Sequence, residues 1–370
     1  VNSCKDQFDF STDNLSTNIE QKSSFALPLV DASITLSEVI PNNEDVNRAL
    51  IVDPDGFLRL EFEYEVTQVP ASDYFDGSYS GATLPDISYK LASQVFELGL
   101  NKLISEGEFY LADPKVTITI KNYWDIPAQF KFADFYYYEE PESAGIPVTG
   151  SFIDWIQINK PVAPEAYAIT NIVLDKTTSN IDEIISALPH HLSFGADFET
   201  ITTPPVSYDV PSSSIDSVSM KVEMPLDLRI ANLLLRDTID FNLGNDLGSD
   251  TSMIESFEFS LILQNGFPIE IGTQVYFVDE NYSILDSIST NLLQVASGIV
   301  TAGKVSQSTE SIIKIQIDKN RLSNLLNSSY LMPKIIFNTA GNASNETVKF
   351  YDNYDVGLKL GALINLKLKN

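Results

Sequence analysis

The chain has 370 residues, 44% of them hydrophobic, and its 51 acidic residues against 23 basic ones give a formal net charge of −28. The hydrophobic fraction excludes disorder over the whole chain, and no apolar run approaches the ~20 residues of a membrane-spanning helix, so a water-soluble body of about two to three domains is expected. The acidic excess excludes nucleic acid as a partner, because phosphate binding needs clustered Lys and Arg.

The amino terminus carries the single cysteine, Cys4, so no intrachain disulfide can form. Cys4 is interpreted either as a leftover thiol in a tail or as a lipid attachment point, and the polar tract 5–24 predicts a flexible stalk. Residues 1–4 resemble the end of a bacterial lipobox, and Lys5-Asp6 followed by Asp9 resembles the export signal of Bacteroidota surface lipoproteins. The resemblance implies acyl chains on Cys4 and anchorage in the outer membrane, at the cell surface or on its periplasmic face.

Alternating apolar residues predict a first strand over 58–66, after the turn signal Asp53-Pro54-Asp55-Gly56. Gly56 is free to take the positive φ that such a turn requires. Asp53 and Asp55 also match the start of a calcium loop, but Phe-Leu-Arg follows where that loop needs acidic ligands. An ordinary turn is therefore favoured over a metal site.

Further along the chain, alternation predicts strands over 116–121, 313–317 and 356–368. Short helical patterns cover 91–103, 178–188 and 321–326. Asn265-Gly266 predicts a tight β-hairpin. Many short strands with few helices favour β-sandwiches over a parallel α/β sheet.

Two motifs recur at one spacing. Asn122 and Asn265 each follow an alternating run and precede a short turn with Pro and a second run, and they lie 143 residues apart. Asp175 and Asp318 each begin an Asp-Lys pair between a strand and a short helical turn, again 143 residues apart. Two motifs at one offset indicate an internal repeat.

A third match pairs the run from Val218 with the run from Val356 at an offset of 138, which implies a change of loop length before it. We therefore predict a stalk at 1–24, a first β-sandwich repeat with an N-terminal extension at 25–230, and a second repeat at 231–370. The strand, Asn, Pro-turn, strand unit resembles the hairpin of late-embryogenesis-abundant-type (WHy) β-sandwiches. The whole chain resembles cell-envelope lipoproteins of the Bacteroidota, and both resemblances imply an all-β fold.

The densest aromatic cluster is Phe-Tyr-Tyr-Tyr at 135–138, followed by two glutamates. Alternate residues of a strand share a face, so one face of this cluster either packs into a core or forms a stripe for stacking on a sugar. The candidate stacking residues are Trp124, Tyr136, Tyr138 and Trp155.

Catalytic and metal-binding candidates are scarce. His190 and His191 are the two histidines, and neighbours on a strand point to opposite faces, so they are not expected to share a metal. No sequence motif of serine hydrolases, nucleotide-binding proteins or zinc peptidases occurs. Paired carboxylates are abundant, but glycosidase chemistry needs a separation that a sequence does not show. We therefore expect no enzymatic activity, no metal and no cofactor.

Three Asp-Ser/Thr-apolar tripeptides resemble the acceptor of Bacteroidota protein O-glycosylation. The resemblance implies glycans on Ser217, Thr238 and Ser287 where those side chains are exposed.

These features together predict a non-catalytic surface lipoprotein that acts as an accessory binding or assembly subunit of an outer-membrane protein complex. Its expected partners are the outer membrane, through Cys4, and a protein in that membrane. A glycan-binding lipoprotein and a lipid-binding tubular protein, whose halves enclose an apolar channel, are the alternatives. A hydrolase that uses paired carboxylates ranks last.

Overall fold

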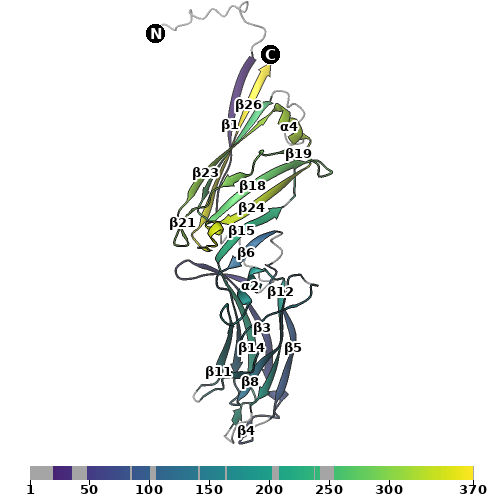
Figure 1. Cartoon of the computed structure of the whole chain (residues 1–370), viewed down its shortest axis with the longest axis vertical. Coiled ribbons are helices and arrows are strands. Elements are labelled where there is room, and N and C mark those ends of the chain that lie inside the picture. The colour runs from purple at the N-terminus through teal and green to yellow at the C-terminus, as the bar shows by residue number, and fades with distance from the viewer. Residues whose placement is uncertain are drawn as a thin grey trace, which may run out of the picture.

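The computed structural model describes residues 20–35, 48–83, 86–100, 106–140, 142–162, 165–201, 208–236, 238–241 and 254–369. Strands dominate, as the sequence predicts, and two lobes are stacked end to end in an elongated molecule (Figure 1). The α-helices in these ranges are α2 (Ile181–Ser186) and α4 (Lys319–Leu326), beside single turns of 3₁₀-helix that include η3 (Ala71–Asp73) and η5 (Asn342–Ser344). No helix in the described part of the chain is long and apolar enough to cross a membrane.

The first lobe is a sandwich of two antiparallel sheets. Its main strands are β2 (Arg48–Val52), β3 (Leu58–Pro70), β5 (Ser88–Glu97), β7 (Lys115–Asn122), β8 (Ala128–Tyr138), β10 (Ile156–Ile158), β11 (Ala168–Leu174), β12 (His191–Thr200) and β14 (Ile215–Pro225). One sheet has the order β11-β7-β14-β3-β2 and the other the order β10-β8-β12-β5, with β9 (Ile146–Pro147) beside β8. Every second residue of β7 is buried, and the inward residues of both sheets form one core that includes Phe62, Phe130 and Phe194.

A small cap closes the far end of this lobe. It contains η3 and the paired strands β4 (Tyr79–Gly81) and β13 (Tyr208–Val210), and Trp124 and Ile126 complete a separate small core there. We call this end of the molecule the distal end. Figure 1 shows it opposite the end at which β1 and β26 lie.

The second lobe is also a sandwich. Its main strands are β1 (Glu20–Thr35), β15 (Asp227–Arg236), β17 (Ile254–Asn265), β18 (Ile269–Val278), β19 (Ile284–Ser287), β20 (Leu293–Val295), β23 (Thr309–Asp318), β24 (Tyr330–Thr339), β25 (Val348–Lys349) and β26 (Asp355–Lys369). The short additional strands are β6 (Glu106–Leu111), β16 (Ile239–Asp240), β21 (Ile299–Thr301) and β22 (Lys304–Gln307). One sheet has the order β1-β26-β17-β23, and the other contains β19-β18-β24-β15-β25 with β20 on β18 and β6 on β15.

Both lobes have one strand order. The sheet β11-β7-β14-β3 of the first lobe corresponds to β23-β17-β26-β1 of the second, and β10-β8-β12-β5 corresponds to β20-β18-β24-β15. The two copies predicted from the sequence are therefore two sandwiches of one topology. They are not consecutive in the chain, because the whole first lobe is inserted between β1 and β15 of the second.

The sequence-based boundaries divide the chain differently from these sheets. The boundary between residues 230 and 231 falls inside β15, which pairs with β24 of the second lobe. Most of β1 falls within the predicted unit 25–230, although β1 pairs with β26 along almost its whole length. Residues 1–19 of the predicted stalk at 1–24 lie outside the described residues.

The strand register gives the third repeated motif an offset that differs from the one predicted from the sequence. Val218 lies opposite Ile120, and Leu358 lies opposite Leu263. Ile120 and Leu263 are 143 residues apart, whereas Val218 and Leu358 are 140 apart, so the predicted offset of 138 was wrong by two. A slip of two residues keeps every side chain on the same face, so an alternating pattern does not reveal it.

Two local predictions were wrong. The helical pattern at 91–103 is strand β5 over its first seven residues, because Leu91 and Phe96 fill the sandwich core beside β12. Asn265-Gly266 does not form a hairpin, since β17 and β18 belong to different sheets. The Asn265 side chain instead accepts a hydrogen bond from Phe267 N–H, and Gly266 N–H donates to Asp355 O, which turns the chain from one sheet to the other.

The lobes pack closely against each other. The core of the first lobe continues into β15 and the segment around Phe350, and Leu58 N–H donates to Phe350 O. The Asp53–Gly56 turn lies at this junction with Gly56 at φ +82°, as predicted, and Asp352 N–H donates to Gly56 O. A Cβ on Gly56 would lie 2.6 Å from Asp352 Oδ1, so this turn is an inter-lobe contact.

Candidate ligand-binding site

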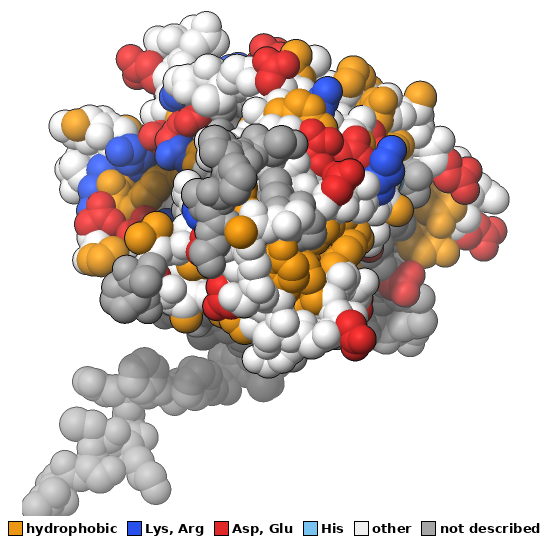
Figure 2. All heavy atoms as spheres, turned by 90° about the horizontal axis from the view of Figure 1, so that it is seen from below, with side chains coloured by type: hydrophobic (Ala, Val, Ile, Leu, Met, Phe, Trp, Pro, Cys, Tyr) orange, Lys and Arg blue, Asp and Glu red, His pale blue; other side chains and the backbone are white. Residues whose placement is uncertain are grey.

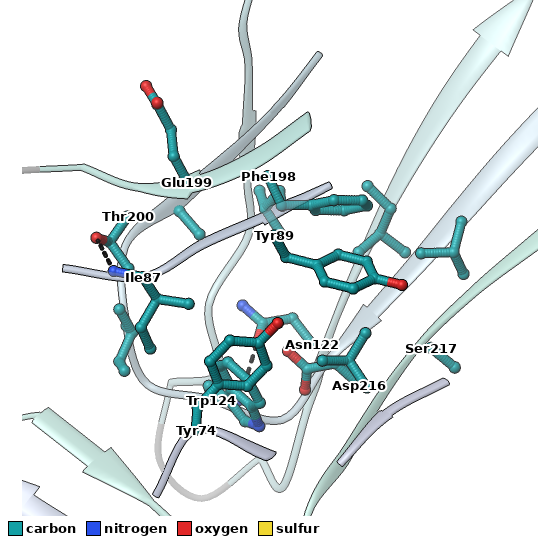
Figure 3. A pocket seen from close by; sticks show the side chains of 16 residues that line it. Tyr74, Ile87, Tyr89, Asn122, Trp124, Phe198, Glu199, Thr200, Asp216 and Ser217 are labelled. Carbon is teal, nitrogen blue, oxygen red and sulfur yellow. Dashed lines mark hydrogen bonds between the residues drawn. The ribbon is translucent and has the colours of Figure 1, made fainter. Parts of the chain in front are cut away.

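A cavity of about 70 Å³ lies between the two sheets of the first lobe, just inside the distal cap (Figure 3). Residues of β3, β5, β7, β8, β10, β12 and β14 and of the adjoining loops line it, and most of its wall is apolar. The side chains that give it chemical character are Tyr74, Tyr89, Asn122, Trp124, Phe198 and Asp216. An apolar cavity with a few polar groups is the usual form of a small-molecule site.

Asp216 is the ionisable group at the centre of this wall. Strand alternation turns Ile215 outward and Asp216 toward the cavity, and Tyr123 N–H donates to Asp216 Oδ1 at 2.7 Å. Burial raises the pKa of the Asp216 carboxyl from 3.8 to about 7, and the Tyr123 hydrogen bond opposes only part of that rise. A carboxyl with this pKa in a cavity is a candidate functional group.

Aromatic side chains form much of the remaining wall. Trp124 is 8% exposed, and its ring packs against Tyr74 and Phe75 at centroid distances of 5.8 and 5.6 Å. Phe198 and Tyr89 lie 5.8 Å apart on the opposite sheet. Trp124, predicted as an exposed stacking residue, is thus a buried part of the cavity wall.

The second lobe shows the same positions without the polar groups. Trp124 and Phe267 both donate their backbone N–H to the repeated Asn two residues earlier, so they are equivalent. Lys121 lies opposite Ser217, and Gln264 opposite Gly357, which makes Asp216 equivalent to Val356. The fold thus tolerates Phe and Val where the first lobe has Trp and Asp.

A groove lies on the outer surface beside this cavity. Tyr123 and Ile215 line it together with three carboxylates, those of Asp125, Glu165 and Asp209. Lys160 Nζ pairs with Asp125 Oδ1 at 2.6 Å. The groove therefore combines apolar and acidic lining residues.

Exposed apolar side chains adjoin the groove, and with Tyr123 we call them the distal patch. The exposed fractions are 72% for Val162, 47% for Ile169, 42% for Ile215 and 40% for Tyr167. The ring of Tyr167 lies 5.3 Å from that of Tyr123. Viewed from the distal end, hydrophobic side chains lie at the surface among scattered acidic ones (Figure 2).

The other predicted stacking residues do not join Trp124. Tyr138 stands at one end of β8 and Ala128 at the other, about 33 Å apart at ~3.3 Å per residue. Tyr138 stacks on His191 at 4.2 Å, and Tyr136 is half-buried. Trp155 is 39% exposed and immediately precedes β10. The four residues therefore do not form one platform.

The two histidines are closer than expected. His190 precedes β12 rather than lying in it, so the alternation of a strand does not apply, and the two Nδ1 atoms are 3.2 Å apart. Burial and the neighbouring His190 lower the pKa of His191. Among the described residues, no three His, Cys, Asp or Glu side chains gather to hold a metal ion.

The predicted modification residues differ in their surroundings. Cys4 lies outside the described residues. Ser217 is half-buried on the central strand β14, and Thr238 is exposed. Ser287 is half-buried, and its hydroxyl donates to Ser289 O. Whether any of them carries a glycan stays a prediction.

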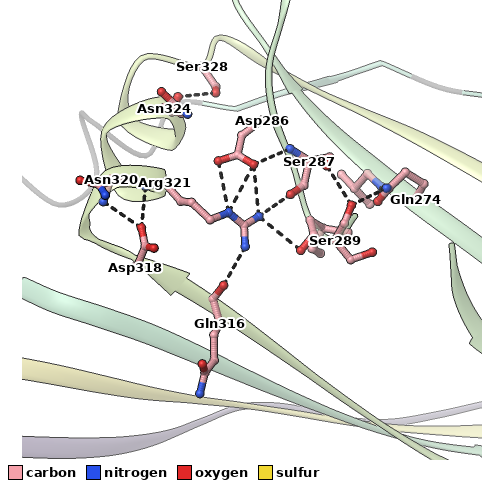
Figure 4. A network of polar contacts seen from close by, with 12 residues as sticks. Gln274, Asp286, Ser287, Ser289, Gln316, Asp318, Asn320, Arg321, Asn324 and Ser328 are labelled. Atoms are coloured by element: carbon pink, nitrogen blue, oxygen red, sulfur yellow. Dashed lines mark hydrogen bonds and ion pairs between the residues drawn. The ribbon is translucent and has the colours of Figure 1, made fainter. Parts of the chain in front are cut away.

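Ser287 belongs to a polar network that fixes α4 to β19 (Figure 4). The Arg321 guanidinium contacts both carboxylate oxygens of Asp286 at 3.3 Å and donates to Gln316 O at 2.7 Å and to Ser287 O. Every donor group of Arg321 therefore serves the packing of the second lobe, and this network is structural.

The chain is similar in structure to a protein of Parabacteroides distasonis ATCC 8503 described as a "putative secreted protein", with 15% identity, a TM-score of 0.49, and coverage of 92% of this chain and 99% of that chain. The VP2 subviral particle of infectious bursal disease virus aligns at 9% identity and a TM-score of 0.20, over 88% of this chain and 85% of that one. No family model and no curated protein sequence matches the chain. Structural alignments with sequence identities and TM-scores this low establish no shared function.

Sequence reasoning missed Asp216, although it singled out the tripeptide that begins with it. The reason is the register. At the offset of 140, which an alternating pattern does not reveal, Asp216 aligns with Val356, so the carboxyl stands where the second lobe has a valine.

Proposed function

We propose that the protein is a non-catalytic binding protein of the cell surface, held at the outer membrane through Cys4, and an accessory subunit of a membrane complex. The observation that carries this proposal is the exposed apolar patch at the distal end of a chain with a net charge of −28. Contiguous exposed apolar side chains on an acidic protein are typical of a docking surface.

The placement of the lobes supports the same role. β1 lies at the end opposite the distal end (Figure 1), and Cys4 precedes Glu20 by sixteen residues. A lipid on Cys4 would then hold the second lobe near the membrane as a stem. The distal patch would face outward, where a partner is within reach.

Paired variants test the docking surface. Ile215→Asp places a charge in the distal patch, and Ile284→Asp places one at a site in the second lobe that is 63% exposed. We expect Ile215→Asp to abolish co-purification of an outer-membrane protein from Bacteroidota membranes, while Ile284→Asp retains it. Equal recovery with both variants would contradict the role of the patch, and a Cys4→Ala variant that stays membrane-bound would contradict the anchor.

Glycan binding is a second candidate, favoured by the tyrosine pair. The Lys121 ammonium lies 4.1 Å from the ring centre of Tyr167 and 5.0 Å from that of Tyr123, which orders both rings beside the carboxylates of the groove. Ordered rings next to carboxylates suit a sugar, which stacks on one and donates hydrogen bonds to the other. A glycan array should then show binding that Tyr167→Ala removes and the exposed-site control Tyr282→Ala keeps.

A further inference from the structure

The two lobes supply an internal comparison for the inter-sheet cavity. One topology and one Asn-centred turn are built twice, once with Trp124 and Asp216 and once with Phe267 and Val356. The apolar pair shows what the fold alone requires at these positions. The polar pair in the first lobe therefore needs another explanation than stability, since a buried carboxyl without a cation is costly.

Asp216 has no cationic side chain in the cavity. The other titratable residues of the wall are Tyr74, Tyr89 and Glu199, and no Lys, Arg or His among the described residues lines it. The backbone N–H of Tyr123 is the hydrogen-bond donor to Asp216. An ionised Asp216 would thus gain from a positive charge brought in by a ligand.

The aromatic walls of the cavity suit the apolar part of such a ligand. In Figure 3 the rings of Tyr74 and Trp124 lie to one side of the Asp216 carboxyl, and those of Tyr89 and Phe198 lie above it. Aromatic faces attract cations and also bury apolar groups. Of the two carboxyl residues in the wall, Glu199 accepts a hydrogen bond from Gln129 and points away from Asp216 in Figure 3. A metal ion needs several oxygen ligands around it, so an organic cation fits a wall that is mostly apolar better.

We propose that this cavity binds a small organic cation, an ammonium group on an apolar body, with Asp216 as its counter-ion and the aromatic side chains as its walls. The acidic surface of the protein would raise the local concentration of such a cation. This site is separate from the distal patch and does not depend on the proposed docking role.

Ethylammonium and ethanol are suitable probes, because they share a small apolar body that suits a cavity of about 70 Å³ and differ in charge. Binding to the full chain at pH 8 is measured by calorimetry and by the fluorescence of the two tryptophans. We expect ethylammonium to bind at least tenfold more tightly than ethanol. The preference should shrink at pH 5, where Asp216 is protonated.

Three variants assign the binding to the cavity. Asp216→Asn should weaken ethylammonium binding about tenfold or more, and Asp216→Val, which installs the residue of the second lobe, should abolish it. Asp209→Asn, in the neighbouring groove, removes the same charge outside the cavity and should leave binding unchanged. Denaturant unfolding confirms that each variant is folded.

Two results would overturn the proposal. One is no ethylammonium binding to the folded protein at concentrations up to about 10 mM. The other is equal binding of both probes, or of the wild type and Asp216→Asn, since the cavity would then select for apolarity alone. Neither result bears on the docking test with Ile215→Asp, so the two proposals fail separately.

Discussion

At the scale of single residues, the repeated side chains carry the local structure. Asn265 is fully buried, and its amide donates to Ile269 O and Ala296 O while its carbonyl accepts from Phe267 N–H. Asn122 makes the equivalent turn in the first lobe. Each amide thus completes hydrogen bonds that the chain cannot make with its backbone alone where it crosses between sheets.

Replacing this amide should be costly. Asn265→Ala removes three part-buried hydrogen bonds and leaves a cavity at a fully buried position, and we expect the free energy of unfolding to fall by about 3 kcal/mol. The exposed Asn281→Ala is the matched control and should change it by less than about 0.5 kcal/mol. Denaturant titration of both variants measures the difference, and equal stabilities would contradict the structural role of Asn265.

Asp216 should make stability fall as pH rises. Its pKa is 3.8 when unfolded and about 7 in the fold, so the folded state binds more protons between these values. The stabilisation of the protonated form is complete below pH 4 and is lost by about pH 7. The difference in the free energy of unfolding between Asp216→Asn and the wild type should shift in favour of the variant by on the order of 2–4 kcal/mol as the pH rises from 4 to 8. A pH-independent difference would contradict the raised pKa.

At the scale of elements, the short helices are held by side chains rather than by their length. Asp318 caps α4 by accepting from Asn320 N–H and Arg321 N–H. Asp175 accepts from Thr177 N–H and Thr178 N–H in the turn that precedes α2, and the N-cap of α2, Asn180, makes no side-chain capping bond. A helix of eight residues is not stable alone in water, so its contacts decide whether it forms.

The Arg321 network should therefore control α4. A lysine cannot reproduce the planar contacts to Asp286 and the two carbonyls, so Arg321→Lys should lower the free energy of unfolding by about 1–3 kcal/mol. Asn324→Ala, on the exposed side of α4, serves as the control. Faster amide hydrogen exchange in α4 and β19 of the lysine variant is the more specific readout, and unchanged exchange would count against this network.

At the scale of the whole molecule, one lobe is inserted into the other. β26 pairs with β17 on one side and with β1 on the other, although the entire first lobe lies between β1 and β15 in the chain. The entropy cost of closing a loop grows slowly with its length, by about 0.6 kcal/mol for each doubling, so a folded insertion of this size is tolerated.

This arrangement predicts an asymmetry between fragments. Residues 48–225 contain every main strand of the first lobe and should fold cooperatively. Residues 226–370 lack β1, which exposes the edge of β26, so they should aggregate or stay unfolded. Adding a peptide of residues 20–35 should rescue the second fragment. Circular dichroism and size-exclusion chromatography report the outcome, and a monomeric, folded 226–370 without the peptide would refute the insertion.

The sequence by itself determined the all-β class, strands such as 58–66 and 356–368, and the two repeated motifs, because alternation and turn chemistry act over a few residues. The tertiary structure alone decided which strands become neighbours. A period of two fixes the face of a side chain but not its partner strand or its register, so neither the place of β1 beside β26 nor the true offset of Val218 was readable. The cavity likewise depends on tertiary structure. Burial among residues of seven strands and their loops raises the pKa of Asp216, and only packing brings these residues together.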